Sequence, residues 1–282
     1  MNYRHAFHAG SFADVVKHAV LACVVAHLRA KQSAFRLIDT HAGSGLTRLT
    51  GPEASRTGEW RQGIGRLLAA NLEPDIRALL APYLDAIAGY NADGRLRAYP
   101  GSPLLALAWL RPQDRLIACE LVPAAAAALA RSLGKDRRAK VIAIDGWTAL
   151  AAYVPPRERR GIVLIDPPFE APGEFERLAE QLAAAHRKWA TGIYLLWYPI
   201  KEIAETERFA RRVAMLGVPK ILRAEVRVAV RQDKSLIGSG LLLVNPPWKL
   251  ETELQSLLPA LATVLGRDRE GAARLDWLTA EK

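Results

Sequence analysis

Residues 161–169 read Gly-Ile-Val-Leu-Ile-Asp-Pro-Pro-Phe, an apolar run that ends in an acid, two prolines and an aromatic residue. The run predicts a buried strand over 161–165, and the prolines predict a stiff turn directly after it. Such a turn can hold the Asp166 carboxylate and the Pro167 carbonyl as two acceptors facing one point, with Phe169 as a stacking surface. Two acceptors that bind both N–H bonds of an aromatic amine favour a pyramidal nitrogen, whose lone pair can then attack a methyl group on a sulfonium.

Three other acids follow apolar runs in the same way as Asp166. Asp39, Glu120 and Asp145 come directly after the runs 35–38, 116–119 and 141–144. Because the carboxyl ends of parallel strands meet at one edge of a sheet, the four carboxylates are expected to gather there. Any one of these acids could instead cap a helix or end a strand in solvent, but the joint pattern is hard to obtain on a random surface.

Strand-like and helix-like segments alternate over most of the chain, which predicts an α/β fold with a mainly parallel sheet and helices on both faces. Further expected elements are helices over 12–31, 124–130, 173–188 and 201–216, and strands over 192–197, 226–230 and 241–244. Residues 46–100 differ, because glycine, proline and helix-like patterns dominate and no strand-like run is evident. We expect a helical insertion there, within an α/β domain made of 1–45 and 101–282.

The turn after the first of these strands contains small residues, Thr40-His41-Ala42-Gly43-Ser44-Gly45. Glycines let the backbone approach a ligand closely and leave N–H groups for a carboxylate or a phosphate. In such a sheet Glu120 can accept hydrogen bonds from ribose hydroxyls, and Asp145 can receive an adenine amino group. The pattern favours a cofactor that contains a nucleoside. A dinucleotide site would need a third glycine, and a P-loop would need Gly-Lys-Ser/Thr, and both are missing.

A second double-proline turn, Asn245-Pro246-Pro247-Trp248, follows another predicted strand and has nearly the same chemistry. If this last strand is antiparallel to the others, its end lies at the opposite edge of the sheet from Asp39. We therefore assign catalysis to Asp166 and expect Asn245 to lie far from the cofactor.

The 282 residues include 39 Lys and Arg against 29 Asp and Glu, a formal net charge of +10. This excess favours a polyanionic partner such as nucleic acid, since it falls in short clusters that include Arg56, Arg61 and Arg66. Neither metal-ligand spacing nor a disulfide framework is visible around Cys23 and Cys119, so no metal is expected. A polar start and the lack of an apolar stretch of about 20 residues predict a soluble, cytoplasmic protein without a membrane span.

Several longer segments extend the pattern over nearly the whole chain. They are Tyr3-Arg4-His5-Ala6-Phe7-His8-Ala9-Gly10, Ala13-Asp14-Val15, Lys17-His18, Asp39-Thr40-His41-Ala42-Gly43, Tyr99-Pro100-Gly101-Ser102-Pro103, Leu196-Trp197-Tyr198-Pro199 and Asn245-Pro246-Pro247-Trp248-Lys249. With the Asp-Pro-Pro-aromatic signature, these segments resemble class I methyltransferases. More narrowly, they resemble the bacterial 23S ribosomal RNA adenine-N6 methyltransferase family known as RlmJ. The N-terminal block is highly specific for this family, whereas the Gly-x-Gly turn is not.

The resemblance implies a Rossmann-like sheet of seven strands, the last antiparallel, with a helical insertion. It also implies transfer of a methyl group from S-adenosylmethionine to N6 of an adenine in 23S ribosomal RNA, at position 2030. The RNA would be protein-free or in an early assembly intermediate, and the enzyme would be a monomer without a metal ion.

Site residues follow from the resemblance together with the glycine turn. Expected cofactor contacts are Lys17, His18, His41, Gly43, Ser102, Glu120, Asp145, Gly146 and Asp166. Asp166, Pro167 and Phe169 would form the catalytic turn, and Tyr3, Arg4 and Phe169 would contact the substrate. Phe169 departs from the family, which often has Tyr there, so stacking is kept but a hydroxyl is missing. Ser11-Phe12 stand in a stretch that the family often fills with polar residues.

Two other functions fit parts of the pattern. A DNA adenine-N6 methyltransferase would use the same tetrapeptide, because both enzymes extrude a base, although no helix-turn-helix or other DNA-reading module is evident. A non-catalytic RNA-binding protein with a relic cofactor pocket would share the fold. The intact acids Asp166 and Glu120 argue against that second alternative.

Overall fold

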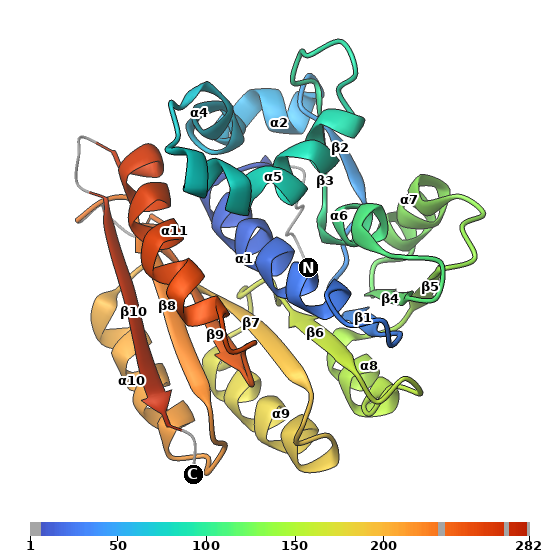
Figure 1. Cartoon of the computed structure of the whole chain (residues 1–282), viewed down its shortest axis with the longest axis vertical. Helices are drawn as coiled ribbons and strands as arrows, with labels where there is room; N and C mark the ends of the chain where they lie inside the picture. The colour runs from blue at the N-terminus through green and yellow to red at the C-terminus, as the bar shows by residue number, and fades with distance from the viewer. Residues whose placement is uncertain (1–6, 231–234, 268–270, 281–282) are drawn as a thin grey trace.

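An eight-stranded sheet runs through the computed structural model, which describes residues 7–230, 235–267 and 271–280 (Figure 1). In spatial order its strands are β10 (Ala272–Thr279), β8 (Ile221–Arg227), β9 (Gly238–Val244), β7 (Ile193–Ile200), β6 (Gly161–Ile165), β1 (Arg36–Asp39), β4 (Arg115–Glu120) and β5 (Ala139–Ala143). The strands from β7 to β5 are parallel. Strand β9 lies between β7 and β8 and is antiparallel to both.

The sheet therefore has the predicted class I architecture with one strand more than the seven expected. The additional strand β10 pairs antiparallel with β8 at the edge of the sheet. Its sequence, Ala-Ala-Arg-Leu-Asp-Trp-Leu-Thr, is only partly buried and has no continuous apolar run. An edge strand of this kind gives a weak sequence signal. It pairs with a single neighbouring strand and is only partly buried, so few of its residues need to be apolar.

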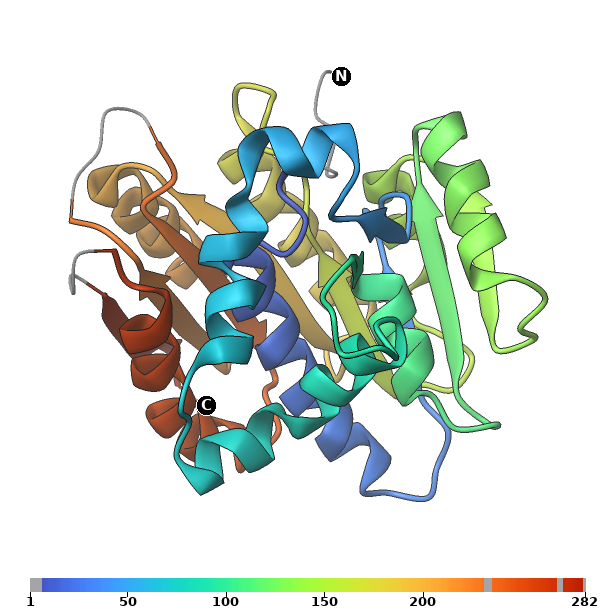
Figure 2. The same cartoon turned by 90° about the horizontal axis from the view of Figure 1, so that it is seen from above.

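Helices cover both faces of the sheet in two layers (Figures 1 and 2). One face carries α1 (Phe12–Arg29), α6 (Ser102–Trp109), α7 (Pro123–Leu133) and α11 (Leu250–Leu265), and the other carries α8 (Gly146–Tyr153), α9 (Glu174–Lys188) and α10 (Ile203–Ala214). The period of two along a strand divides the core between the faces. In β1, Leu37 belongs to the first apolar cluster and Ile38 to the second.

The stretch 46–100 is mostly helical but also contains two short strands that the sequence did not reveal. Its helices are α2 (Pro52–Thr57), α3 (Glu59–Gln62), α4 (Ile64–Ala69) and α5 (Pro74–Gly89), and its strands are β2 (Leu46–Arg48) and β3 (Ala98–Pro100). The strands pair antiparallel and bring the two ends of the stretch together. Three residues are too few to show a period of two, which explains why the pattern was missed.

This stretch is fastened to the segment that leads into α1. The Ile64 N–H donates to the Gly10 carbonyl oxygen over 2.9 Å, and the Thr57 hydroxyl donates to the Phe7 carbonyl oxygen. The backbones approach so closely that a Cβ on Gly63 would lie 2.1 Å from the Gly10 oxygen. The start of α1 is therefore positioned by residues fifty or more places further along the chain.

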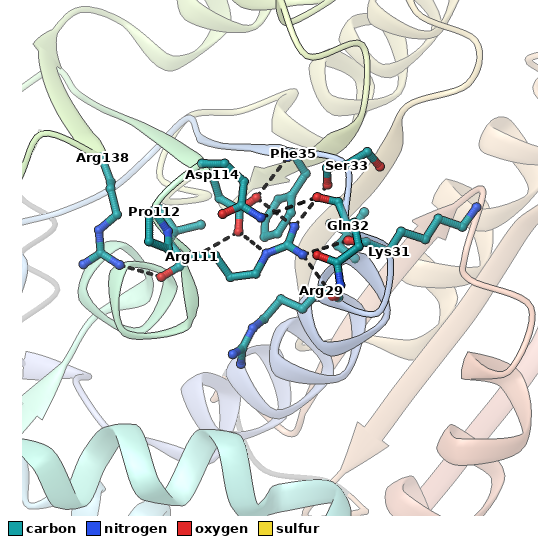
Figure 3. Close-up of polar contacts among 12 residues, drawn as sticks. Arg29, Lys31, Gln32, Ser33, Phe35, Arg111, Pro112, Asp114 and Arg138 are labelled. Carbon is teal, nitrogen blue, oxygen red and sulfur yellow. Dashed lines mark hydrogen bonds and ion pairs between the residues drawn. The ribbon is translucent and has the colours of Figure 1, made fainter.

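At the edge where the parallel strands begin, one arginine ties the end of α1 to the sheet (Figure 3). The Arg111 guanidinium donates to the carbonyl oxygens of Arg29, Lys31 and Ser33 and to the buried Asp114 carboxylate. Asp114 also accepts the Phe35 N–H, just before β1. The opposite ends of the strands are thereby left for the ligand site. In the described part of the chain no helix is long and apolar enough to cross a membrane.

The close contact at Gly63 predicts a large effect of one methyl group. Gly63→Ala should lower the free energy of unfolding by at least about 2 kcal/mol, because the new Cβ meets a backbone oxygen that cannot move aside. Gly89→Ala is the matched control: this exposed residue ends α5 with nothing within 4 Å of the added carbon, so stability should stay equal or rise by up to about 1 kcal/mol. Urea unfolding measures both. If both substitutions changed the free energy of unfolding by the same amount, the close contact between Gly63 and Gly10 would be contradicted.

Candidate functional site

A cavity of about 780 Å³ opens at the carboxyl ends of the parallel strands, where open α/β sheets bind their ligands. All nine residues that the sequence analysis expected around a cofactor line it: Lys17, His18, His41, Gly43, Ser102, Glu120, Asp145, Gly146 and Asp166. Asp166 and the glycine turn therefore share one pocket. The wall also contains Trp147, Glu174 and Arg177, which the sequence did not single out.

The glycine turn is held by Glu120. The Gly43 N–H donates to Glu120 Oε2 over 2.9 Å, and the Val122 N–H donates to Oε1 over 2.8 Å. The expectation that the turn leaves its N–H groups free is therefore wrong for Gly43, because the strand-end acid already accepts that hydrogen. Each carboxylate oxygen of Glu120 keeps a lone pair, so the acid can still accept from ribose hydroxyls.

Asp39 lies beneath the cavity rather than in its wall. Its carboxylate is fully buried and accepts from the Ser102 hydroxyl over 2.6 Å and from the His41 N–H over 3.3 Å. Burial raises the pKa of Asp39 to about 7, against the lowering effect of the Ser102 hydrogen bond. Ser102 is the first residue of α6 and its side chain does not cap the helix, since Gly101 is the N-cap residue. The serine instead connects the buried acid to the pocket.

Asp145 caps α8, which is one of the roles that the sequence analysis considered for a single strand-end acid. Its Oδ2 accepts from the Thr148 N–H over 2.9 Å and from the Thr148 hydroxyl over 3.0 Å. The next residue must be glycine, because a Cβ on Gly146 would lie 2.4 Å from the Thr40 oxygen and 2.6 Å from His41 Nε2. The cap thereby brings Asp145 and the His41 ring to one wall of the cavity.

His41 is held as a neutral hydrogen-bond acceptor. The Thr40 hydroxyl donates its only hydrogen to the Leu164 carbonyl oxygen over 2.9 Å. Its oxygen, 2.8 Å from His41 Nδ1, must then accept, so Nδ1 carries the histidine proton. Burial lowers the pKa of His41 to about 4, and the ring is neutral at pH 7 with a bare lone pair on Nε2. The Trp147 ring packs edge-on against His41, with centroids 5.2 Å apart.

Lys17 is a buried ammonium shared by two carboxylates. Its Nζ lies 2.5 Å from Asp166 Oδ2 and 2.9 Å from Asp14 Oδ1, and the residue is 4% exposed. Burial works to lower the pKa of Lys17, but the two carboxylates outweigh it and raise that pKa above its ordinary value. No described residue donates to the other oxygen of Asp166, Oδ1. Asp14 was not predicted, although its spacing of three from Lys17 places both on one helix face.

Phe169 and Pro167 do not line the cavity, although Pro168 between them does. Phe169 has a left-handed backbone, with φ of 51°, and its half-buried ring packs 4.9 Å from the Phe175 ring and 5.7 Å from the Trp197 ring. Lys17 Nζ lies 5.8 Å from the Trp197 ring centroid. These three rings form an aromatic cluster beside the Lys17–Asp166 pair. No local pattern in the sequence indicated that Trp197 belongs to it.

The remaining sequence-based expectations fall elsewhere. Tyr3 and Arg4 lie outside the described residues. Asn245 stands at the opposite edge, as expected, because β9 is antiparallel and its last residue pairs with the start of β7. Arg66, one of the clustered basic residues, donates to the Gly266 carbonyl oxygen over 2.8 Å. Within the part of the chain that the structure describes, no three His, Cys, Asp or Glu side chains gather as a metal site would require.

Comparisons with known proteins show which family the chain resembles. A family model described as ribosomal RNA large subunit methyltransferase D, RlmJ, matches residues 32–279. The ribosomal RNA large subunit methyltransferases J of Escherichia coli K12 and Haemophilus influenzae Rd are 39% and 37% identical to this chain, over 100% of each protein. The crystal structure of a Legionella pneumophila protein superimposes with a TM-score of 0.87 at 32% identity, covering 96% of this chain and 98% of that one.

The buried acid Asp39 predicts a pH-dependent stability. Its pKa is about 7 in the folded chain against 3.8 as the ordinary value, so the folded form keeps a proton that the unfolded chain has lost. Wild type should therefore lose stability relative to Asp39→Asn as the pH rises from about 4 to about 8, by up to about 4 kcal/mol. Urea titrations across this range measure the difference.

Asp114→Asn is the control for this titration. Asp114 is also fully buried, but its pKa is lowered, because hydrogen bonds from Arg111 outweigh the effect of burial. Its contribution is complete above pH 3.8 and disappears only at lower pH, so the difference from wild type should stay flat between pH 5 and 8. If the stability difference between wild type and Asp39→Asn were also constant over this pH range, Asp39 would not be protonated in the folded chain.

Proposed function

Because this chain belongs to the ribosomal RNA large subunit methyltransferase J family, we propose that it methylates the N6 amino group of an adenine in 23S ribosomal RNA. S-adenosylmethionine is the cofactor of this family. The observation that carries the proposal is the position of Asp166 in the cavity wall, where Oδ2 is paired with Lys17 and no described residue donates to Oδ1.

The cavity wall offers what each part of this cofactor needs. Glu120 has lone pairs for the ribose hydroxyls, and Asp145 has an oxygen besides its capping Oδ2 for the adenine amino group. The amino-acid part carries both a carboxylate and an ammonium group, and His18, His41 and Ser102 offer polar atoms for them. When bound, the cofactor supplies a methyl group on a positively charged sulfur, which leaves as the thioether of S-adenosylhomocysteine.

Asp166 and its turn prepare the amine for this transfer. Lys17 holds Oδ2 and so fixes the carboxylate, which leaves Oδ1 to accept one N–H of the target amino group. The Pro167 carbonyl accepts the second N–H in our proposal. The nitrogen lone pair then forms the new N–C bond, and the electrons of the S–C bond go to sulfur. The nitrogen gives up one proton, to Asp166 or to water, because the alkylated amine is far more acidic than its parent.

The aromatic cluster at Phe169 and Trp197 provides the stacking surface for the extruded base. Base stacking on an aromatic ring contributes about 1–3 kcal/mol and is tolerant of sequence. Because Phe169 packs against Phe175 and Trp197 rather than into the cavity, the base would approach the cluster from the Lys17 side.

A first prediction concerns Asp166. Asp166→Asn keeps the shape but replaces an anionic acceptor and loses its ion pair with Lys17, so kcat for methyl transfer should fall by about 100-fold or more. Tritiated S-adenosylmethionine and protein-free 23S ribosomal RNA give the rate, and nucleoside digests identify the product. Trp248→Ala is the control at the other double-proline turn, where an 84% exposed ring stands far from the cavity, and its kcat should stay within about twofold.

The same assay separates the substrates. N6-methyladenine from ribosomal RNA and none from duplex DNA is the expected result. Label in DNA alone would support the DNA methyltransferase alternative, and no label in either nucleic acid would refute the proposed reaction.

A second prediction concerns RNA binding at the insertion. Arg56 and Arg61 are exposed next to the segment that leads into α1, with guanidinium carbons 6.0 Å from the Phe7 ring and 4.9 Å from the Trp60 ring. We propose that both bind RNA phosphates. The double variant Arg56→Ala/Arg61→Ala should bind RNA more weakly, and the slope of log K against log salt should fall by roughly 0.7 for each phosphate that the variant no longer neutralises.

Lys135→Ala/Arg137→Ala is the control for this experiment. These exposed residues precede β5, at the edge where the parallel strands begin, and the variant removes the same charge. Its salt slope should equal that of wild type. Equal slopes for both double variants would place the RNA elsewhere.

A further inference from the structure

A chain of three buried rings connects the insertion to the cofactor cavity. His18 Nδ1 lies 2.7 Å from the Tyr99 hydroxyl oxygen, which lies 2.8 Å from that of Tyr83. His18 is 1% exposed and both tyrosines are fully buried. The histidine belongs to α1 and lines the cavity, whereas Tyr99 comes from β3 and Tyr83 from α5.

Counting hydrogens fixes the direction of this chain. Among the described residues, the Tyr83 hydroxyl has one hydrogen-bond partner, the Tyr99 hydroxyl. A buried hydroxyl that does not donate loses a hydrogen bond that it makes to water in the unfolded chain, so Tyr83 donates to the Tyr99 oxygen. The Tyr99 hydrogen must then point the other way, to His18 Nδ1. Burial raises the pKa values of both tyrosines, so both hydroxyls keep their hydrogens at neutral pH.

We propose that the Tyr99 hydroxyl, which accepts the hydrogen of Tyr83, fixes His18 as the tautomer protonated on Nε2. This histidine is then a hydrogen-bond donor to the amino-acid part of the cofactor. A neutral imidazole whose Nδ1 accepts must carry its proton on Nε2. Tyr99 is a positioning residue, since it acts through His18 and does not line the cavity. The inference rests on the proposed function for the identity of that ligand.

The second pocket histidine is fixed in the opposite form. His41 carries its proton on Nδ1, because the Thr40 hydroxyl is committed to the Leu164 oxygen, and its Nε2 is an acceptor. One cavity thus offers a neutral donor, His18, and a neutral acceptor, His41. A zwitterionic amino acid presents the complement, a carboxylate that accepts and an ammonium that donates. We therefore expect the cavity to prefer a cofactor whose amino-acid part carries both its carboxylate and its ammonium group.

Nitrogen NMR of the ligand-free protein with ¹⁵N-labelled histidine tests the tautomers directly. His18→Gln and His41→Gln spectra assign the two rings. We expect His18 to have a bare Nδ1 and a protonated Nε2 at about pH 7.5, and His41 to have the reverse. This readout does not depend on methyl transfer or on RNA, and a merely structural role of the tyrosines would not produce it.

Two hydroxyl deletions provide a graded comparison. Tyr99→Phe removes the donor to Nδ1, so the His18 signals should move toward a mixture of tautomers. Tyr83→Phe should leave the tautomer unchanged, because among the described residues Tyr99 then still has His18 alone to receive its hydrogen. Calorimetry with S-adenosylhomocysteine should show about tenfold weaker binding to Tyr99→Phe and less than about threefold weaker binding to Tyr83→Phe.

A His18 ring protonated on Nδ1 in the wild type would overturn the inference, whatever the activity. A tautomer change in Tyr83→Phe as large as in Tyr99→Phe would overturn the hydrogen count. If Tyr99→Phe does not fold, the wild-type spectrum alone still decides. The expected tautomers together with no N6-methyladenine in RNA would refute the proposed function and leave the inference standing.

Discussion

One buried charge organises the site: the Lys17 ammonium, held between Asp14 and Asp166. An uncompensated charge at this depth would cost several kcal/mol, so the fold needs both carboxylates in place. Asp14 comes from the same helix, but Asp166 comes from the end of β6, almost 150 residues further along the chain. The ion pair therefore fixes α1 against the sheet edge, ties one oxygen of Asp166 to the lysine and leaves the other for the cavity. Stability and catalytic geometry depend on the same contact.

The insertion supports this arrangement at the same end of α1. Its Gly63 contact positions the residues before the helix, and Tyr83 and Tyr99 reach His18 from below the cavity. A stretch that looks like a separate subdomain in the sequence thus contacts His18, a residue of the cavity wall. Its exposed face carries Arg56 and Arg61, the two arginines proposed above to bind RNA phosphates.

Local patterns in the sequence revealed the fold and the catalytic turn because both depend on short-range rules. Apolar runs that end in acids indicated the parallel strands, and two adjacent prolines indicated the stiff turn at Asp166. Contacts between distant segments have no such signature, which is why Trp197 and the edge strand β10 were missed. The strand-end rule also could not say that Asp39 points beneath the pocket while Glu120 lies in its wall, since this depends on what packs above each strand.

The two double-proline turns differ in the direction of the preceding strand and in one side-chain atom, and these differences decide which turn faces the cavity and which partners it binds. Both turns are stiff, but Asp166 follows a strand parallel to β1 and Asn245 follows one that runs the other way. Asn245 uses its amide as a donor, to the carbonyl oxygens of Ala190 and Gly192 at 2.8 Å, and a carboxylate there would face two acceptors. Asp166 accepts from Lys17, and an amide there would leave a buried ammonium half-compensated. The choice between acid and amide is thus set by the partner: a structural turn needs a donor, whereas a turn that grips an amine needs an acceptor.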